Sequence, residues 1–592
     1  MAVLYIMTLV MPLLVLPGIV DNAFKAPKDL VLITGAALLA GMYAFRYLSG
    51  KDIPFPKTCT PRLVLCLILL NLFNLFYTQN YFYTRLAVSL NIAALLVFFF
   101  LSIRINGRRA LTIIVLTALC GVIISIETYL QFVGHFILFK WAHQGIMVMG
   151  TIGNSNYLGA YYIFPLFAAV ALVFLAKGPW KLIPAACLTF MLGAFLFSRA
   201  RGAWVGFFLA LPVLLWVLCR VYQFKILPYI RANTGRVATA LVLGIAILTS
   251  LWFAAPDRLH KMMSFKQVTK SDTLLLRMDK YSRASWWLIK QNPLFGTGLW
   301  SFRSRVYDAQ AEIEKTNPGF YENYPEPKPR RVHMEYLEIL NHGGLIAALA
   351  LAVFFLTVMR HGWRVIRRGQ IPIRDRVAAA AAFCSLIAIM LNAVFFFPFQ
   401  ISSTLFMTAL MLGILEGLYV NHSGPVGVRP GWSGPAGRFL IPVVLLVLVG
   451  WVWFTSIKPF KGEREHWHYK MALQNGRLKE AETHLLRAIE LDPHNTAYNM
   501  YAAQFYLDAS RNFPEAGKYL ERVILDYNGD ITRWSVFYLK GVVKFQSGNL
   551  FEAREAFEQA VYYNPEFQPA QQQLKDVNQV IKDHDRVMIK FR

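Results

Sequence analysis

Two arginines interrupt a long apolar stretch in the sequence Ser198-Arg199-Ala-Arg201-Gly-Ala-Trp204. Ionisable side chains at membrane depth are costly and usually have a function. The planar guanidinium group matches phosphate oxygens through paired hydrogen bonds. An arginine pair that only stabilises an interfacial turn explains the spacing equally well. Arg199, Arg201 and Trp204 are therefore candidate binding residues with two open interpretations.

A second motif begins at Arg283 and continues through two tryptophans to the sequence Asn292-Pro-Leu-Phe-Gly296-Thr-Gly298. Its pattern predicts an amphipathic helix at a membrane interface, anchored by the aromatic pair, followed by a turn. Gly-x-Gly alone is a weak signal for a phosphate-binding loop, and it is equally compatible with a simple turn. Arg277, just upstream, is a further candidate cation.

A histidine, His333, directly precedes the helix expected to lead into the next apolar span, and it follows Arg330 and Arg331. Near neutral pH a histidine at this position can accept a proton from a reacting group. Position alone favours a histidine that merely forms a hydrogen bond at the interface.

A fourth motif, from Gly150 to Gly159, contains Asn154 and Asn156 at the start of another apolar span. The asparagines could receive a polar ligand, or one of them could cap the helix. Both interpretations fit the spacing.

These four motifs lie in a chain with the composition of a membrane protein. Of its 592 residues, 56% are hydrophobic and 16% are charged, whereas soluble proteins carry about 25% charged residues. Many apolar blocks are long enough to cross the hydrocarbon core of a bilayer. We predict thirteen spans, at residues 3–20, 30–45, 63–78, 86–103, 110–133, 156–176, 182–198, 202–219, 237–256, 343–359, 377–397, 401–420 and 439–457.

The loops between the spans predict an orientation. With the N-terminus in the cytoplasm, the cytoplasmic loops carry 21 basic residues and the short loops of the other face carry six, which follows the positive-inside rule. The loop from Asp257 to His342 then lies outside the cytoplasm with the Ser198–Arg201 turn. The excess positive charge lies in the membrane part, which argues for topology signals and an anionic ligand and against a nucleic-acid surface.

The last 130 residues have a different, repetitive pattern. Ala481, Ala516 and Ala553 occupy equivalent places and are 35 and 37 residues apart, close to the period of about 34 residues in paired-helix repeats. This region resembles the tetratricopeptide family, with three repeats and a terminal helix. Such repeats bind partners or pack against their own chain.

We therefore predict an all-α protein with four regions. Spans one to nine occupy residues 1–256, a large loop occupies 257–342, spans ten to thirteen occupy 343–462 and the repeat domain occupies 463–592. The Pro-rich run from Pro325 to Arg331 is expected to be the movable part of the loop, where an acceptor would be chosen.

Taken together and in this order, the four motifs resemble the O-antigen ligase/polymerase superfamily of membrane glycan transferases. The resemblance is carried by Gly150–Leu158, Ala200–Trp204, Arg283–Gly298 and His333–Ala347. The chain departs from the family pattern at Met334, at Ala347 and at His342, where the family has a glutamate nine residues after the histidine.

The resemblance implies transfer of a glycan from undecaprenyl pyrophosphate to an acceptor hydroxyl by inverting displacement, at the periplasmic face of a bacterial inner membrane and without metal or cofactor. Arg201 and Arg283 would stabilise the leaving pyrophosphate, and His333 would act as general base. Arg199, Arg277, Asn154, Asn156, Trp204 and Tyr336 would bind substrate. The lipid A-core acceptor of lipopolysaccharide biosynthesis is favoured over a growing polysaccharide or a protein.

Two readings from other classes are a polysaccharide transporter or flippase and a membrane-anchored repeat scaffold with a protein partner. Few intramembrane charges and no matching pair of broken helices disfavour a transporter. Deleting residues 463–592 is expected to remove all function from a scaffold and to leave a transferase some chemistry.

Overall fold

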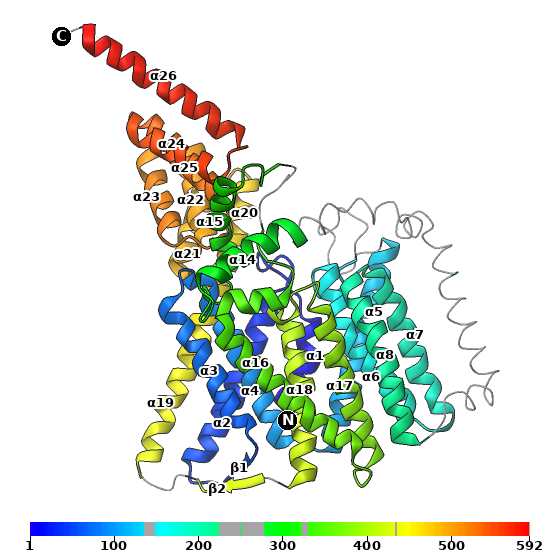
Figure 1. Ribbon diagram of the computed structural model, residues 1–592. Coiled ribbons are helices and arrows are strands. Elements are labelled where there is room, and N and C mark those ends of the chain that lie inside the picture. The colour runs from blue at the N-terminus through cyan, green and yellow to red at the C-terminus, as the bar shows by residue number, and fades with distance from the viewer. Residues whose placement is uncertain are drawn as a thin grey trace.

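The computed structural model describes residues 1–134, 148–223, 249, 277–322, 329–424, 426–431 and 435–590. This part of the chain is almost entirely helical (Figure 1). It contains 11 helical segments that are long and apolar enough to cross a membrane. They are α2 (Ala26–Leu48), α3 (Thr60–Tyr77), α4 (Tyr81–Arg104), α5 (Gly107–Val133), α6 (Ser155–Leu175), Gly178–Phe197 with α7 (Leu182–Phe197), α8 (Arg201–Tyr222), α16 (Glu335–Arg367), α17 (Ile373–Asn392), α18 (Ser402–Ser423) and Phe439–Gln474, which includes most of α19 (Pro435–Val452) and all of α20 (Lys458–Gln474).

The all-α prediction is confirmed, with one correction to the spans. The first span was predicted for residues 3–20, but helix α1 (Ala2–Leu13) is shorter, and Leu14 is already extended. Pro17 follows three residues after the cap residue Leu14, and proline is common shortly after a helix end because it cannot continue the helix. The ninth span, residues 237–256, lies outside the described residues except for Thr249.

Small residues bring the membrane helices close together. Gly206 of α8 lies so close to α17 that an added Cβ would stand 2.3 Å from the Ala388 carbonyl oxygen. The facing stretch of α17 from Ala378 to Ala382 is buried. Helices in membranes commonly associate by close backbone approach through small residues. Lipid tails are as apolar as the side chains, so the hydrophobic effect does not drive helices together there, and close packing does. The contact fixes α8, and with it Arg201 at its first turn.

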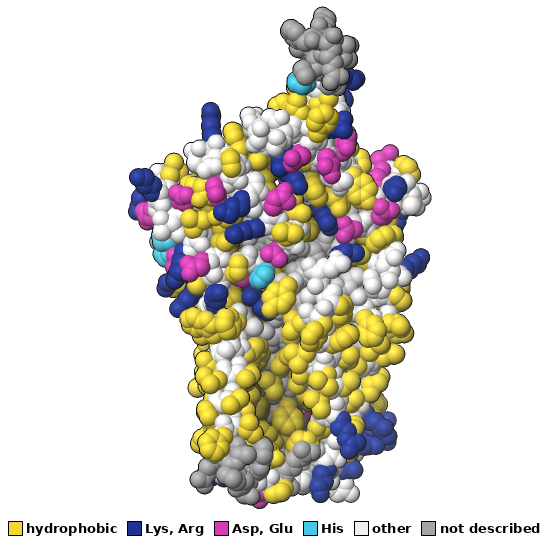
Figure 2. Space-filling model, turned by 90° about the vertical axis from the view of Figure 1, so that its left-hand side faces the viewer, with side chains coloured by type: hydrophobic (Ala, Val, Ile, Leu, Met, Phe, Trp, Pro, Cys, Tyr) yellow, Lys and Arg dark blue, Asp and Glu magenta, His cyan; other side chains and the backbone are white. Residues whose placement is uncertain are grey.

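The two ends of the helical bundle differ. At one end, strands β1 (Ile53–Pro56) and β2 (Val426–Arg429) pair antiparallel, and the N-terminus lies at this end (Figure 1). The repeat domain lies at the other end. Figure 2 shows hydrophobic side chains over the bundle, mixed charges over the repeat domain, and a group of Lys and Arg near the bundle's far end. This arrangement agrees with the predicted sorting of the loops to two faces.

The repeat domain consists of three helix pairs and a terminal helix. The pairs are α20 with α21 (Leu478–Leu491), α22 (Thr496–Asp508) with α23 (Phe513–Leu525), and α24 (Arg533–Gln546) with α25 (Leu550–Tyr563), followed by α26 (Gln568–Lys590). Ala481, Ala516 and Ala553 are the fourth residues of α21, α23 and α25, and all three are fully buried. The predicted repeat pattern is confirmed.

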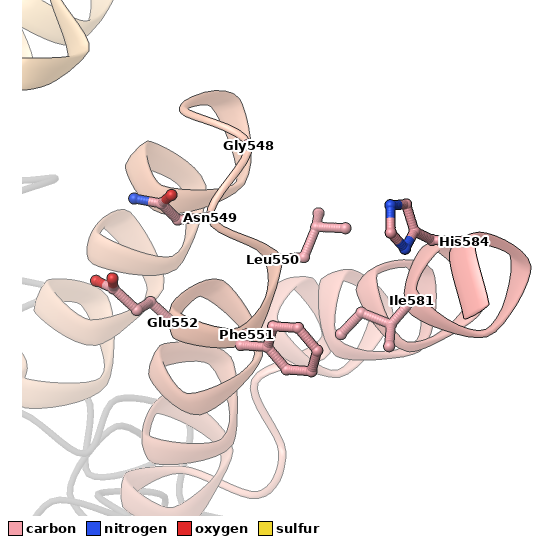
Figure 3. Close-up of a pocket in the computed structure, with 7 residues that line it drawn as sticks. All are labelled: Gly548, Asn549, Leu550, Phe551, Glu552, Ile581 and His584. Atoms are coloured by element: carbon pink, nitrogen blue, oxygen red, sulfur yellow. The ribbon is translucent and has the colours of Figure 1, made fainter. Parts of the chain in front are cut away.

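A surface cleft of about 300 Å³ lies at the outer end of the repeat domain, between the start of α25 and α26 (Figure 3). It is lined by Gly548, Asn549, Leu550, Phe551, Glu552, Ile581 and His584. No lysine or arginine lines it, and the Glu552 carboxylate is paired with Lys544 at 2.5 Å. The cleft therefore lacks the cations that a phosphate ligand needs.

The described residues of the large loop, 277–322 and 329–342, lie between the bundle and the repeat domain (Figure 1). Its helices α14 (Ser282–Gln291) and α15 (Phe302–Thr316) share one hydrophobic core with the repeat helices. Tyr307 of α15 contacts Trp534 with ring centroids 5.5 Å apart, and the Tyr321 hydroxyl donates to the Tyr563 carbonyl at 2.7 Å. Loop and repeat domain thus form one packed unit.

Candidate functional site

The arginine turn lies between α7 and α8 and is braced by its own motif. Arg199 adopts a left-handed backbone conformation with φ of 54°, and Arg201 is the exposed first residue of α8. The Trp204 indole donates a hydrogen bond to the Phe195 carbonyl at 3.2 Å. Burial, with the nearby charge of Arg201, lowers the pKa of Arg199. Two neighbouring cations suit a multiply charged anion.

The asparagine motif packs directly onto this turn. An added Cβ at Gly159 of α6 would stand 2.2 Å from the Ala200 Cβ. The Asn154 side chain accepts a hydrogen bond from the Asn156 amide at 2.9 Å and caps α6. The capping interpretation of Asn154 is confirmed. Ligand binding by Asn154 and Asn156 stays a prediction.

The segment from Asn392 to Phe397 connects the arginine turn to His333. Gly202 lies against Asn392 and Phe395, with contacts of 3.1 and 3.2 Å from a Cβ built there. Phe397 then contacts the His333 ring, with centroids 5.0 Å apart. Tyr157 of the asparagine motif contacts the same Phe397 at 6.0 Å. Three motifs far apart in the sequence therefore meet around one aromatic segment.

His333 lies in a constrained position before α16. Its φ is 63°, and its ring lies between Phe397 and Tyr281, with the Tyr281 ring stacked at 6.3 Å. A left-handed backbone at a non-glycine residue is held only where the surroundings impose it, and such residues gather at functional sites. The nearby Tyr336 hydroxyl donates to the Met390 carbonyl at 2.8 Å, and binding of substrate by Tyr336 stays a prediction.

The second motif forms the expected amphipathic helix. In α14, Ala284, Ser285, Leu288 and Ile289 are buried, whereas Trp286 is half exposed. The Arg283 guanidinium is exposed, lies 3.3 Å from the Asp279 carboxylate and is stacked over Phe320. An anion would have to compete with Asp279 for it. The Arg277 side chain lies outside the described residues, and the roles of both arginines stay predictions.

The two glycines after α14 are needed for packing. Gly296 and Gly298 have φ of 70° and 104°, and the Gly298 amide donates to the His342 carbonyl at 3.0 Å. Helix α16 breaks at Gly344, where an added Cβ would meet the Leu294 backbone at 2.3 Å. Because the Gly298 amide bonds to the protein itself, the turn interpretation of Gly-x-Gly is confirmed over phosphate binding.

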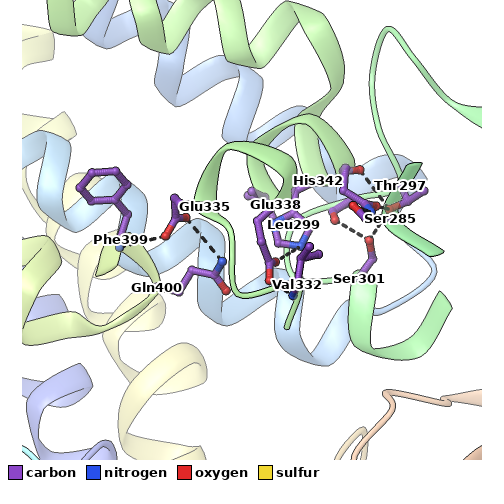
Figure 4. A network of polar contacts seen from close by, with 12 residues as sticks. Ser285, Thr297, Leu299, Ser301, Val332, Glu335, Glu338, His342, Phe399 and Gln400 are labelled. Atoms are coloured by element: carbon purple, nitrogen blue, oxygen red, sulfur yellow. Dashed lines mark hydrogen bonds and ion pairs between the residues drawn. The ribbon is translucent and has the colours of Figure 1, made fainter. Parts of the chain in front are cut away.

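A buried polar network supports this region (Figure 4). The Glu338 carboxylate accepts the Val332 amide at 2.5 Å and lies 3.1 Å from the His342 ring. The Glu335 carboxylate accepts the Phe399 amide at 3.2 Å. The network thus joins Val332, directly before His333, to Glu338 of α16, and it joins Glu335 at the start of α16 to the segment before α18.

Sequence reasoning missed Arg331 as a site residue. Its guanidinium lies over the Trp300 ring at 4.6 Å and the Phe397 ring at 5.6 Å. Within the described residues, no carboxylate oxygen lies within 4.0 Å of it. Burial lowers the pKa of Arg331, and the more distant Glu338 only partly opposes this shift. The adjacent pair Arg330-Arg331 was the available signal, but its sequence does not show which arginine turns inward.

A cavity of about 730 Å³ lies in the bundle below these residues, with mostly apolar walls. Trp300, Glu335 and His342 belong to its lining, as do Leu351, Phe354 and Leu412 deeper in the bundle. Volumes of this size are typical of sites for small ligands. The cavity therefore adjoins the surface site through Trp300.

Fold and site define a multi-pass membrane protein with a cationic surface site and a helical-repeat domain packed on its large loop. Residues 186–352 match the family model described as O-antigen ligase, and residues 470–495 and 535–567 match tetratricopeptide repeats. Both predicted resemblances are confirmed for these residues, and the first supports a glycosyl-transferring ligase or polymerase. No curated protein matches the chain. Within the described residues, no three His, Cys, Asp or Glu side chains gather as metal ligands would.

Proposed function

We propose that this protein transfers a glycan from undecaprenyl pyrophosphate to an acceptor hydroxyl at the periplasmic face of a bacterial inner membrane, with a lipid A-core sugar as the favoured acceptor. The observation that carries the proposal is the meeting of three family motifs around Phe395 and Phe397, within a chain of which residues 186–352 match the O-antigen ligase family.

The proposed chemistry assigns one role to His333 and another to the arginine turn. His333 takes the proton of the acceptor hydroxyl as its oxygen bonds to the anomeric carbon. The bond from that carbon to the pyrophosphate oxygen breaks, and the leaving group departs with the electron pair. The guanidinium cations of Arg201 and Arg199 stabilise the negative charge of the leaving group, because they are in position before the reaction begins. Attack opposite the leaving group inverts the anomeric carbon.

The repeat domain favours an enzyme over a free scaffold. Its helices share a core with α14 and α15, so much of its surface serves to hold the loop that carries His333. A polysaccharide polymerase and a protein O-glycosyltransferase have the same donor chemistry and differ from a ligase only in acceptor.

The test uses full-length protein in proteoliposomes with a purified lipid-linked glycan and three acceptors: lipid A-core, free repeat-unit glycan and a periplasmic protein. Mass gain of one acceptor identifies the acceptor class. His333→Ala and Arg201→Ala are expected to insert normally and to lower turnover by about 100-fold or more, the scale of losing a general base or a preorganised charge. Full activity of both variants contradicts the assignment, and transport of the glycan without mass gain favours a flippase.

A further inference from the structure

The Arg331 guanidinium has the environment of a phosphate-binding residue. Two other arginines of low exposure have acidic partners: the buried Arg303 lies 3.4 Å from Asp530, and the half-buried Arg85 lies 3.1 Å from Asp492. Arg331 has two aromatic rings instead, and no carboxylate within 4.0 Å among the described residues. A partly buried charge without a counter-ion is costly, and a stacked guanidinium still offers its donors at the ring edge to an anion.

Trp300 joins this cation to the membrane interior. Its ring is buried, contacts Arg331 on one side and also lines the apolar cavity. Lys25 adds a second cation over the same ring at 5.4 Å, although Asp29 pairs with it at 2.6 Å. Tryptophan is favoured at headgroup level because one part of its ring system is apolar and the other polar.

The cavity extends along α16. Both Gly343 and Leu356 of α16 line it, and at 1.5 Å per residue these positions are about 20 Å apart along the helix. A volume of about 730 Å³ over that length has room for a hydrocarbon chain. A cation at the mouth and an apolar groove below it suit a lipid with a phosphate head.

We propose that Arg331 binds the phosphate of a polyprenyl phosphate lipid whose chain enters the cavity beneath Trp300. The proposal rests on the proposed function, because the lipid is the carrier portion of the donor. The proposal adds Arg331 to the cations that the family resemblance implies. It also places the start of the carrier chain beneath Trp300.

The experiment measures binding rather than turnover. Full-length protein in phosphatidylcholine nanodiscs is titrated with undecaprenyl phosphate, and bound lipid is counted by native mass spectrometry. Arg331→Gln is compared with Arg330→Gln, its exposed neighbour. Ala348→Phe, which fills the cavity, is compared with Leu349→Phe on the exposed side of the same helix turn.

Arg331→Gln and Ala348→Phe are each expected to weaken binding about tenfold or more, the loss that follows removal of one charge-assisted contact or of the chain site. The two control variants are expected to bind like the unmodified protein. Arg331→Lys, which keeps the charge without the planar fork, is expected to fall between them and guards against misfolding of the glutamine variant.

Three competitors distinguish the ligand classes. Undecaprenol tests the chain alone, inorganic pyrophosphate tests the head alone, and phosphatidylglycerol tests an ordinary anionic bilayer lipid. Equal binding of undecaprenol and undecaprenyl phosphate, full displacement by phosphatidylglycerol, or unchanged binding by Arg331→Gln overturns the proposal. Binding that depends on Arg331 in a protein that transfers no glycan supports the lipid site and rejects the transferase.

Discussion

Asp530 is predicted to hold the large loop against the repeat domain, and its removal should loosen α15 specifically. Its carboxylate accepts the Tyr83 hydroxyl at 2.6 Å and lies 3.4 Å from the buried Arg303 guanidinium. Asp530→Ala would leave Arg303 buried over the Tyr83 ring without an acidic partner. Breaking one side of a buried ion pair costs about 3–5 kcal/mol.

The expected effect is an easier local opening of the interface between loop and repeat domain. Taking ~3 kcal/mol, and about 1.4 kcal/mol per factor of ten, amide hydrogens of α15 should exchange roughly 100-fold faster. Hydrogen–deuterium exchange of the full-length protein measures this directly.

The matched control is Glu480→Ala, which breaks the exposed pair between Arg477 and Glu480 within the same domain. Exposed pairs contribute about 0–1 kcal/mol, so α15 exchange should stay near that of the unmodified protein. Arg303→Met combined with Asp530→Ala removes the stranded charge and should recover part of the protection. Equal α15 exchange in Asp530→Ala and Glu480→Ala would refute the argument.

Two further predictions follow from the same packing. Gly344→Ala should lower thermal stability and glycan transfer together, because the φ of 64° at Gly344 and the nearby Leu294 backbone exclude a Cβ. The control Gly450→Ala should lower neither, because no atom lies within 4 Å of a Cβ added there. Differential scanning fluorimetry and the transfer assay check both variants, and an unaffected Gly344→Ala protein counts against a rigid break in α16. The sequence alone predicts that a transferase without residues 463–592 keeps some chemistry, but the packing changes this expectation. The deletion should abolish transfer, because it uncovers the buried Tyr307 and Tyr321 and removes the partner of Arg303, so it does not separate a transferase from a scaffold. Retained transfer by the truncated, inserted protein would show that the loop folds without the repeats.

Hydropathy and periodicity predicted most of the fold because both signals are local. Apolar blocks locate spans wherever the chain crosses a membrane, and the spacing of Ala481, Ala516 and Ala553 locates the repeats. The short α1 was missed because Leu14, Val15 and Leu16 are apolar, so hydropathy does not register that the helix ends at Leu13.

The candidate site was only partly predictable because its partners come from distant parts of the chain. Sequence order of the motifs indicated that His333 and the arginine turn belong together, but not that Phe395 and Phe397 connect them. The docking of the repeat domain depends on Asp530 and on Tyr563, which look like ordinary surface residues in a repeat pattern. Long-range partners of this kind leave no periodic trace.

The departure of the chain from the family pattern at His342 has a structural compensation. His342 stands where the family pattern has a glutamate. A carboxylate nevertheless lies beside His342, because Glu338 is one turn earlier on α16 and 3.1 Å from the His342 ring. The same carboxylate accepts the Val332 amide, directly before His333. A buried carboxylate that binds both groups helps to hold the backbone directly before His333. Glu338 thus supplies a buried carboxylate one helical turn before His342 and bonded to the residue before the proposed general base.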